Sequence, residues 1–176
     1  MRVIGGEFRS RRLKSIPGTD VRPTPDRLRE ALFNVLAPRI RDTVFLDAYG
    51  GTGAVGIEAV SRGAANAIFI EKTRAAAELI EENAASLGIA DRCRVLRGSV
   101  QLMLPRHPAD IVFLDPPYDQ EKEYELALAI LGESAPPLVI VQHASRLVLP
   151  AERGKLRRTR VLRQGDNSLS FYEPIY

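Results

Sequence analysis

The feature that most constrains this chain is a regular alternation of apolar runs and helical patterns between residues 43 and 143. Strands and helices that alternate at this spacing form βαβ units, so the sequence predicts an α/β fold with a mostly parallel sheet covered on both faces. The runs of strand length are Thr43–Asp47, Ala67–Glu71, Cys93–Arg97, Ala109–Asp115 and Leu138–His143. The helical patterns between them are Gly53–Arg62, Ala75–Leu87, a short one near Val100–Leu104, and Glu121–Leu131.

Two extended patterns flank this core. Near the C-terminus, Arg157–Arg163 and Ser168–Tyr172 enclose a Gly-Asp-Asn turn, which predicts an antiparallel hairpin at the edge of the sheet. Near the N-terminus, Val3-Ile4, the pair Gly5-Gly6 and the run Phe8–Ile16 predict a small β-hairpin that carries many basic residues.

A helix is predicted to follow the N-terminal hairpin. Thr24 suits the N-cap of this helix, and Pro25 suits its first position, where a missing N–H costs nothing. The apolar stripe of the helix consists of Leu28, Leu32, Val35 and Leu36. Because the chain has no repeat, linker or low-complexity tract, we expect a single domain over residues 1–176, with an N-terminal extension (1–41) and a core (42–176).

A glycine-rich loop, Ala48-Tyr49-Gly50-Gly51-Thr52-Gly53-Ala54-Val55-Gly56, follows the first strand-like run. Glycines let the backbone approach a ligand closely, and the next helix directs its free N–H groups toward that ligand. Gly51, Gly53 and Gly56 match the G-x-G-x-x-G pattern, and Glu71 ends the next strand, where an acid binds an adenosine ribose. The pattern fits NAD and S-adenosylmethionine almost equally, and the alternative for Glu71 is a plain surface acid.

Two details favour S-adenosylmethionine. Asp47 lies three residues before Gly50, where a carboxylate can meet the cationic part of this cofactor but would repel a pyrophosphate. The second detail is an Asp-Pro-Pro-Tyr stretch, which has no evident use in hydride transfer. Ser99 follows the third strand, where the adenine edge should be read, and the alternative use of its hydroxyl is a helix N-cap.

The Asp-Pro-Pro-Tyr stretch, residues 115–118, directly follows the fourth apolar run. Prolines cannot extend a sheet and they fix φ, so this loop should be rigid with its carbonyls pointing outward. A carboxylate, fixed carbonyl acceptors and a flat ring suit a planar group that bears an amino N–H. Alone, the stretch fits an ordinary exit from a strand equally well. The glycine loop favours a site, because ligand crevices in open α/β sheets lie at these strand ends.

Charge is distributed unevenly along the chain, although the net charge is only +3. Residues 1–41 contain ten Lys and Arg against four Asp and Glu, and residues 151–165 contain six against one. Residues 42–150 contain nine against fifteen. Basic flanks around an acidic centre favour a polyanionic partner held by the flanks, over the alternative that charged termini only solvate the fold.

The composition also bounds the compartment and the chemistry. No apolar run is long enough to span a bilayer, and the N-terminus lacks the apolar segment of a signal peptide. One cysteine and two scattered histidines do not suit a disulfide or a metal cluster. We therefore expect a cytoplasmic monomer with no metal and no membrane contact.

The glycine loop, Glu71 and the Asp-Pro-Pro-Tyr stretch, at these spacings, resemble the class I methyltransferases that act on exocyclic amino groups. The chain is further similar, over nearly its whole length, to the bacterial 16S rRNA guanine-N2 methyltransferases of the RsmD type. The similar blocks are IGGEFRSRRLKS at 4–15, RPTPDRLREALFNVL at 22–36, GIEAVSRGA at 56–64 and GDNSLSFY at 165–172. The resemblance implies a Rossmann-like sheet, S-adenosylmethionine as cofactor, and methyl transfer to a guanine amino group of 16S rRNA, free or in an assembly particle.

The motifs and the resemblance together give the predicted site residues. The reaction loop consists of Asp115, Pro116, Pro117 and Tyr118. The predicted cofactor residues are Asp47, Tyr49, Gly50, Gly51, Thr52, Gly53, Glu71, Lys72, Ser99 and Val100. The predicted substrate residues are Arg9, Arg11, Arg12, Lys14, Arg22, Thr24 and Arg27, and the resemblance implies that the block 22–36 covers cofactor and base. The alternative for Arg27 is an exposed helix charge. The basic cluster at 153–163 should also bind phosphates.

This chain departs from the family's pattern at two places, and other functions remain in competition. The family often has an acidic residue at the position of Ser99 and a glutamate near Gln142-His143, so we assign no role to the latter pair. We expect Asp115 and the Pro116 carbonyl to accept N–H bonds from guanine N2, and Tyr118 to stack on an extruded base or, alternatively, to pack on the next helix. Competing functions are methylation of DNA, of another RNA adenine or cytosine, or of a protein amide; NAD-dependent oxidation; and non-catalytic RNA binding.

Overall fold

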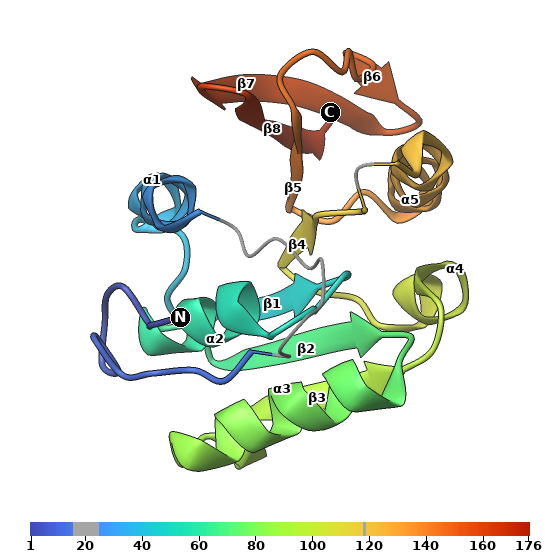
Figure 1. The fold of residues 1–176 in the computed structure, drawn as a ribbon. Helices are drawn as coiled ribbons and strands as arrows, with labels where there is room; N and C mark the ends of the chain where they lie inside the picture. Colours follow the sequence, from blue (N-terminus) through green and yellow to red (C-terminus); the bar gives the residue numbers. More distant parts are fainter. Residues whose placement is uncertain (16–24, 118) are drawn as a thin grey trace.

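The computed structural model describes residues 1–15, 25–117 and 119–176, and within them a single twisted sheet carries helices on both faces (Figure 1). The sheet has eight strands in the order β3-β2-β1-β4-β5-β8-β7-β6. Strands β1 to β5 pair in parallel, whereas β8, β7 and β6 each pair antiparallel with the strand before them in this order. The bounds are β1 Val44–Asp47, β2 Asn66–Glu71, β3 Cys93–Arg97, β4 Ile111–Leu114, β5 Leu138–Ala144, β6 Glu152–Arg153, β7 Leu156–Gln164 and β8 Asn167–Pro174. This confirms the predicted α/β fold with its C-terminal antiparallel hairpin.

The helices divide between the two faces because successive side chains of a strand point in opposite directions. In β1, Phe45 packs with α1 and α2, whereas Leu46 packs with α4 and α5. A third apolar cluster joins α2 and α3 to the N-terminal segment through Val3, Phe8 and Leu13. The helix bounds are α1 Asp26–Leu36, α2 Ala54–Ser61, α3 Arg74–Ser86, α4 Val100–Met103 and α5 Glu121–Ser134, with short 3₁₀ helices η1 Ala90–Arg92 and η2 Leu104–Arg106.

The N-terminal segment, residues 1–15, folds back on itself as predicted, with the Val3 N–H donating to the Arg11 carbonyl and the Leu13 N–H donating to the Met1 carbonyl. One isolated antiparallel bridge, between Arg2 and Arg12, is the only β-pairing recorded within this segment. Most of its polar contacts go instead to helices. Glu58 of α2 accepts hydrogen bonds from the backbone N–H groups of Ile4 and Gly5, and buried Asn83 of α3 exchanges two bonds with the Lys14 backbone. The segment is therefore a short antiparallel hairpin whose remaining backbone groups are satisfied by the helices.

The start of α1 lies one position later than predicted. Pro25 is the N-cap rather than the first helical residue, and Asp26 begins the helix. Thr24, the predicted N-cap, lies outside the described residues. A shift of one residue is within the usual variation of helix bounds. The apolar stripe stays where it was predicted, since Leu28, Leu32 and Leu36 are buried.

The described residues contain neither a membrane-spanning helix nor a cluster of metal-binding side chains. None of the helices described combines the length and apolar character needed to cross a bilayer. Across residues 1–15, 25–117 and 119–176, no group of three or more His, Cys, Asp or Glu is arranged to hold a metal ion.

Candidate active site

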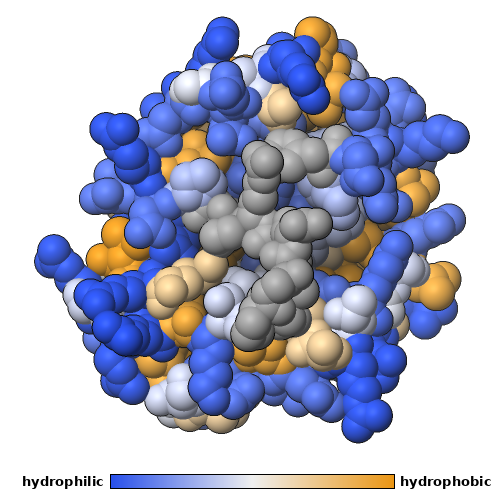
Figure 2. Space-filling model, in the orientation of Figure 1, coloured by the Kyte–Doolittle hydropathy of each residue, from blue (hydrophilic) through white to orange (hydrophobic). Residues whose placement is uncertain are grey.

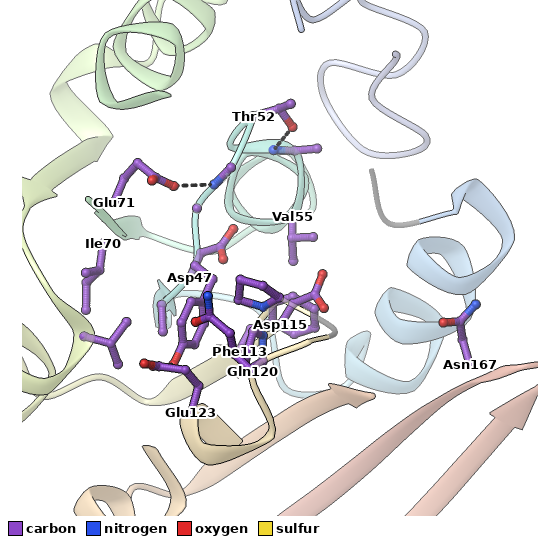
Figure 3. A pocket seen from close by; sticks show the side chains of 18 of the residues that line it. Asp47, Thr52, Val55, Ile70, Glu71, Phe113, Asp115, Gln120, Glu123 and Asn167 are labelled. Atoms are coloured by element: carbon purple, nitrogen blue, oxygen red, sulfur yellow. Dashed lines mark hydrogen bonds between the residues drawn. The ribbon is translucent and has the colours of Figure 1, made fainter. Parts of the chain in front are cut away.

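A cavity of about 1310 Å³ opens at the carboxyl ends of the parallel strands (Figure 3). Strand order reverses beside β1, between β1 and β4, and such a switch point creates a crevice for ligands. The glycine loop follows β1, Glu71 ends β2, and Asp115 follows β4, and all three line the cavity. Sheet topology therefore collects residues that are far apart in sequence at one place.

The glycine loop has a conformation that favours glycine. Gly51 and Gly53 both have positive φ, +57° and +83°, and Gly53 is the N-cap of α2. Gly56 lies so close to the Phe69 ring that an added Cβ would stand 2.3 Å from a ring carbon. The loop thus turns sharply into α2 while the helix packs tightly on β2, and the backbone of Gly50 and Gly51 is left lining the cavity.

Glu71 is fixed at the end of β2 by backbone donors. Its Oε2 accepts a bond of 2.9 Å from the Gly51 N–H, and its Oε1 accepts one of 3.0 Å from the Lys72 N–H (Figure 3). Oε1 also accepts a bond of 3.3 Å from the Thr73 N–H. A carboxylate has about four acceptor positions, so these three bonds leave capacity for a ligand hydroxyl. Glu71 is half-buried and lines the cavity, and its contact with a ribose remains a prediction.

Asp47 is almost completely buried at the end of β1, with 1 % of its surface exposed. Its Oδ2 accepts a bond of 3.3 Å from the Gly56 N–H, whereas Oδ1 has no hydrogen-bond partner among the described residues. Burial first, and then the nearby carboxylates of Asp115 and Glu71, raise the pKa of Asp47 well above its usual range. A buried carboxylate oxygen without a partner fits a cationic ligand, so the residues present suit the positively charged cofactor inferred from the sequence.

Asp115 stands immediately after β4, between the two sides of the cavity. Burial raises its pKa from 3.8 to about 7, so the carboxyl group can hold or release a proton near neutral pH. Pro116 is buried and Pro117 is exposed, and both line the cavity. The predicted stacking residue, Tyr118, lies outside the described residues.

Other predicted cofactor residues fall into two groups. Tyr49, Thr52, Lys72 and Val100 line the cavity, together with Gly50 and Gly51. Gly53 and Ser99 are not among the lining residues. The Ser99 side chain instead caps α4 by accepting a bond of 3.2 Å from the Leu102 N–H, and its neighbours Gly98 and Val100 border the cavity. The cap is the alternative use that the sequence left open, and a contact between Ser99 and adenine remains a prediction.

The predicted basic substrate residues that the structure describes are not among those lining the cavity. Arg9, Arg11, Arg12 and Lys14 are all exposed on the N-terminal segment, where Arg11 reaches the Ser86 carbonyl and Lys14 pairs with Glu82. Arg27 is exposed on α1, as expected for the alternative of an exposed helix charge, and a contact with substrate remains a prediction. Arg22 and Thr24 lie outside the described residues.

The structure adds lining residues that sequence reasoning missed. On the side formed by the glycine loop and Glu71, which we call the cofactor side, Glu123 of α5 accepts a bond of 2.9 Å from the Tyr49 hydroxyl. Burial and this carboxylate raise the pKa of Tyr49, which keeps its hydroxyl protonated as a donor. On the far side, the missed residues are Ala144, Ser145, Arg146, Asp166 and Asn167, and they are joined by Arg163, which belongs to the predicted basic cluster at 153–163. Asp166 and Asn167 belong to the GDNSLSFY block that resembles the family, but nothing in that block indicates that they line a cavity.

Comparison with solved structures assigns this architecture to a class of protein. The structure "Putative methyltransferase yhhF from Escherichia coli" superimposes with a TM-score of 0.85 at 34% identity, covering 99% of this chain and 97% of that one. The strand order and the loops after β1, β2 and β4 are accordingly those of a class I methyltransferase.

The sequence comparisons identify the family more narrowly. The chain belongs to the family described as "Conserved hypothetical protein 95", whose model matches residues 1–173. It is 32% identical over 184 residues to "Putative rRNA methyltransferase YlbH" of Bacillus subtilis, covering 98% of both chains. It is also 44% identical over 120 residues to "Ribosomal RNA small subunit methyltransferase D" of Escherichia coli, covering 67% of this chain and 60% of the relative. The resemblance to the RsmD type is thereby confirmed.

Proposed function

We propose that this protein transfers a methyl group from S-adenosylmethionine to the exocyclic N2 amino group of a guanine in 16S rRNA. The observation that carries the proposal is the pairing, in one cavity, of a buried carboxylate oxygen without a partner at Asp47 and a titratable carboxyl at Asp115. The first suits a cationic cofactor, and the second suits an amine that must lose a proton. The names of the relatives support ribosomal RNA as the substrate class.

The cofactor would be held by the side of the cavity that the glycine loop forms. The Glu71 carboxylate would accept the ribose hydroxyls, the Gly50-Gly51 backbone would lie along the cofactor, and the Asp47 carboxylate would face its cationic part. When bound, S-adenosylmethionine supplies an electrophilic methyl group on a sulfonium. Apolar contact from Ile70 and Val100 would cover the adenine ring.

The guanine amine needs activation, because its nitrogen lone pair is delocalised into the ring. The Asp115 carboxylate would accept one amino N–H, and the Pro116 carbonyl would accept the other. These bonds favour a tetrahedral nitrogen and aim its lone pair, and holding the reacting atoms roughly 3–3.5 Å apart supplies much of the acceleration. Asp115 would then take the proton that the methylated nitrogen loses, a contribution of about 10²–10⁴-fold.

Ribosomal RNA as substrate agrees with the charge distribution. The arginines and lysine of the N-terminal segment are exposed, and so are Arg157 and Arg160 of β7. Contacts of this kind bind phosphates without reading sequence, so RNA affinity should fall steeply between about 50 mM and about 300 mM salt. We further propose that the enzyme acts as a monomer in the cytoplasm, on rRNA that is free or in an assembly particle. Affinity that does not change with salt would contradict the electrostatic part of the proposal.

The decisive experiment uses RNA that lacks the modification. Small-subunit RNA and assembly particles from a strain deleted for this gene would be incubated with the purified protein and tritiated S-adenosylmethionine. We expect label in one nucleoside, N2-methylguanosine, and digestion followed by mapping would identify its position. Label in adenosine or cytidine, or in DNA supplied as competitor, would replace the proposed substrate.

A further inference from the structure

The far side of the cavity, beyond Asp115, is formed by parts of the chain that have no role in the proposed cofactor site. Ala144 ends β5, and Ser145 and Arg146 follow it, while Arg163, Asp166 and Asn167 border the turn between β7 and β8. We call these six residues the distal wall. In Figure 3, Asp115 lies between Glu71 and Asn167, and the sheet order agrees, since β4 separates β1 and β2 from β5 and β8.

Sheet pairing brings the two parts of the distal wall together. Because β8 runs antiparallel to β5, its first residue lies beside the last residue of β5, and Ala144 pairs with Asn167. The end of β7 lies next to them, where Gln164 also pairs with Asn167. A hairpin at the sheet's edge thus extends the edge formed by the carboxyl ends of the parallel strands.

The distal wall is held in place by hydrogen bonds. The Ser145 N–H donates to the Asp166 carbonyl at 2.8 Å, and the Ser145 hydroxyl donates to the Gly165 carbonyl at 3.0 Å. The same hydroxyl lies 2.9 Å from the Ser168 hydroxyl. Arg163 is oriented by a bond of 3.2 Å from its Nε to the Gly165 carbonyl. The turn and the exit from β5 therefore form one preorganised surface, and preorganisation lowers the entropic cost of binding.

The distal wall differs in charge from the cofactor side. Its charged side chains are Arg146, Arg163 and Asp166, all exposed, whereas the cofactor side carries Asp47, Glu71 and Glu123 with Lys72. The face of the molecule in Figure 2 is mostly hydrophilic, and its apolar side chains form small separate groups. Two exposed guanidinium groups that line the cavity suit phosphate, which arginine binds through its planar fork of donors.

The cavity has room for a second ligand beside a cofactor. Its volume of about 1310 Å³ exceeds the roughly 300–1,000 Å³ that is usual for a site holding one small molecule. An enzyme that modifies a base must turn the nucleotide out of its stack, and the backbone on both sides of that nucleotide must then be held. The distal wall is the part of the lining next to Asp115 that carries arginines.

We propose that the distal wall is a phosphate clamp, in which Arg146 and Arg163 bind RNA backbone phosphates next to the extruded nucleotide and so position its base at Asp115. This inference rests on the proposed function and adds to it a substrate subsite. It separates Arg163 from the other arginines of β7: Arg157 and Arg160 do not line the cavity and add only general attraction to RNA. Arg146 and Arg163 are positioning residues, since neither touches the reacting atoms.

The test compares the double variant Arg146→Gln/Arg163→Gln with two single variants. Arg160→Gln removes a charge from β7 outside the cavity, and Arg94→Gln removes an exposed charge from β3, far along the sheet. For each protein, RNA affinity at several salt concentrations, the affinity for S-adenosylmethionine by calorimetry, and kcat and KM for methylation of undermethylated small-subunit RNA would be measured. Thermal unfolding would check that each variant is folded.

For the clamp we expect three results in the double variant. The slope of log affinity against log salt should shrink by about 2, because each lost phosphate contact removes about 0.9. The kcat measured at saturating RNA should fall by about 10²-fold, because a misplacement of about 1 Å can cost that much. Cofactor affinity should match the wild type. Arg160→Gln should shrink the slope by at most about 1, and Arg94→Gln, which lies outside every predicted RNA contact, should behave as the wild type in slope and in kcat.

Two other results would distinguish failure of the clamp from failure of the proposed function. If the wild type methylates RNA while the double variant keeps its kcat and loses no more affinity than Arg160→Gln, the clamp is wrong and the proposed function stands. If the wild type binds RNA with cofactor but methylates none, the proposed function is wrong, and a normal salt slope in the double variant would overturn the clamp as well.

Discussion

The two sides of the cavity are built from different kinds of sheet and carry opposite charges. The cofactor side follows parallel strands, contains the glycine loop and holds its acids in or near the protein interior. The distal wall follows a parallel strand paired with an antiparallel hairpin, and its charged groups are exposed. Asp115 stands at the boundary, and its carboxyl is the one that burial brings to a pKa of about 7.

This difference shows how one edge of a sheet can serve two ligands of opposite charge. Buried carboxylates suit a small cationic ligand that displaces water from the site. The attraction between buried charges is little screened by solvent and salt. Exposed arginines suit a polyanion that arrives from solvent and must leave again, because surface attraction is strong enough to guide binding and is weakened by salt. The following predictions test the separation between the two sides.

The largest expected effect comes from the boundary residue. Asp115→Asn keeps the size of the side chain but cannot take a proton, so turnover should fall by about 10²–10⁴-fold. Affinities for S-adenosylmethionine and RNA should change little, because neither side of the cavity is altered. Single-turnover methylation and calorimetry would measure these quantities. Full activity in this variant would exclude Asp115 from the reaction.

A smaller effect is expected on the cofactor side. Glu71→Gln retains an oxygen for the Gly51 N–H but removes the charge that strengthens bonds to ribose hydroxyls. A hydrogen bond to a charged group contributes about 1.5–3 kcal/mol, so cofactor affinity should fall about 10–100-fold. RNA affinity should stay at the wild-type value. The matched control is Glu133→Gln, which changes an exposed acid on α5. An equal loss of cofactor affinity in both variants would show that Glu71 has no special role in cofactor binding.

The pH dependence should reveal Asp115 in two opposite ways. Methylation requires its ionised form, so kcat/KM should rise roughly tenfold per pH unit below about 7 and level off above that. Stability should move the other way: the folded state keeps a proton that the unfolded state loses near pH 3.8, so this group lowers stability as pH rises from about 4 to about 7. Chemical denaturation across this range, with Asp115→Asn as control, would measure the second trend. A variant with an unchanged pH trend would show that another group is responsible.

The smallest expected effect on catalysis comes from a residue outside the cavity. Asn83 donates to the carbonyls of Lys14 and Thr52 and accepts from the Lys14 N–H. Asn83→Ala would leave these backbone groups without partners, at a cost of about 1–3 kcal/mol, or a melting temperature lower by roughly 2–10 °C. Turnover should stay within a few-fold of the wild type. Differential scanning calorimetry would measure the shift, with the exposed Ser134→Ala as control.

The sequence predicted the parts of the site whose position depends on local order along the chain. The bounds of β3 are the predicted ones, and the glycine loop, Glu71 and Asp115 lie at strand ends as expected, because motif and strand are adjacent in sequence. Arg163 was predicted to bind phosphates, but the distal wall as a whole was not, because only the register of β5, β8 and β7 brings Arg146 and Arg163 to the same cavity. The N-terminal hairpin was predicted, but its attachment to distant helix groups such as Glu58 and Asn83 was not, because those contacts depend on the tertiary fold.

The buried carboxyl groups also alter the charge of the whole molecule. The formal value of +3 counts Asp47 and Asp115 as anions, yet burial raises the pKa of both. Each proton that these two groups retain adds one positive charge, so below about pH 7 the folded protein is more cationic than its sequence and migrates accordingly in an electric field. Unfolding releases those protons above about pH 4 and brings the charge back toward the formal value. The difference between native and denatured electrophoretic mobility therefore reports on the interior of the cavity.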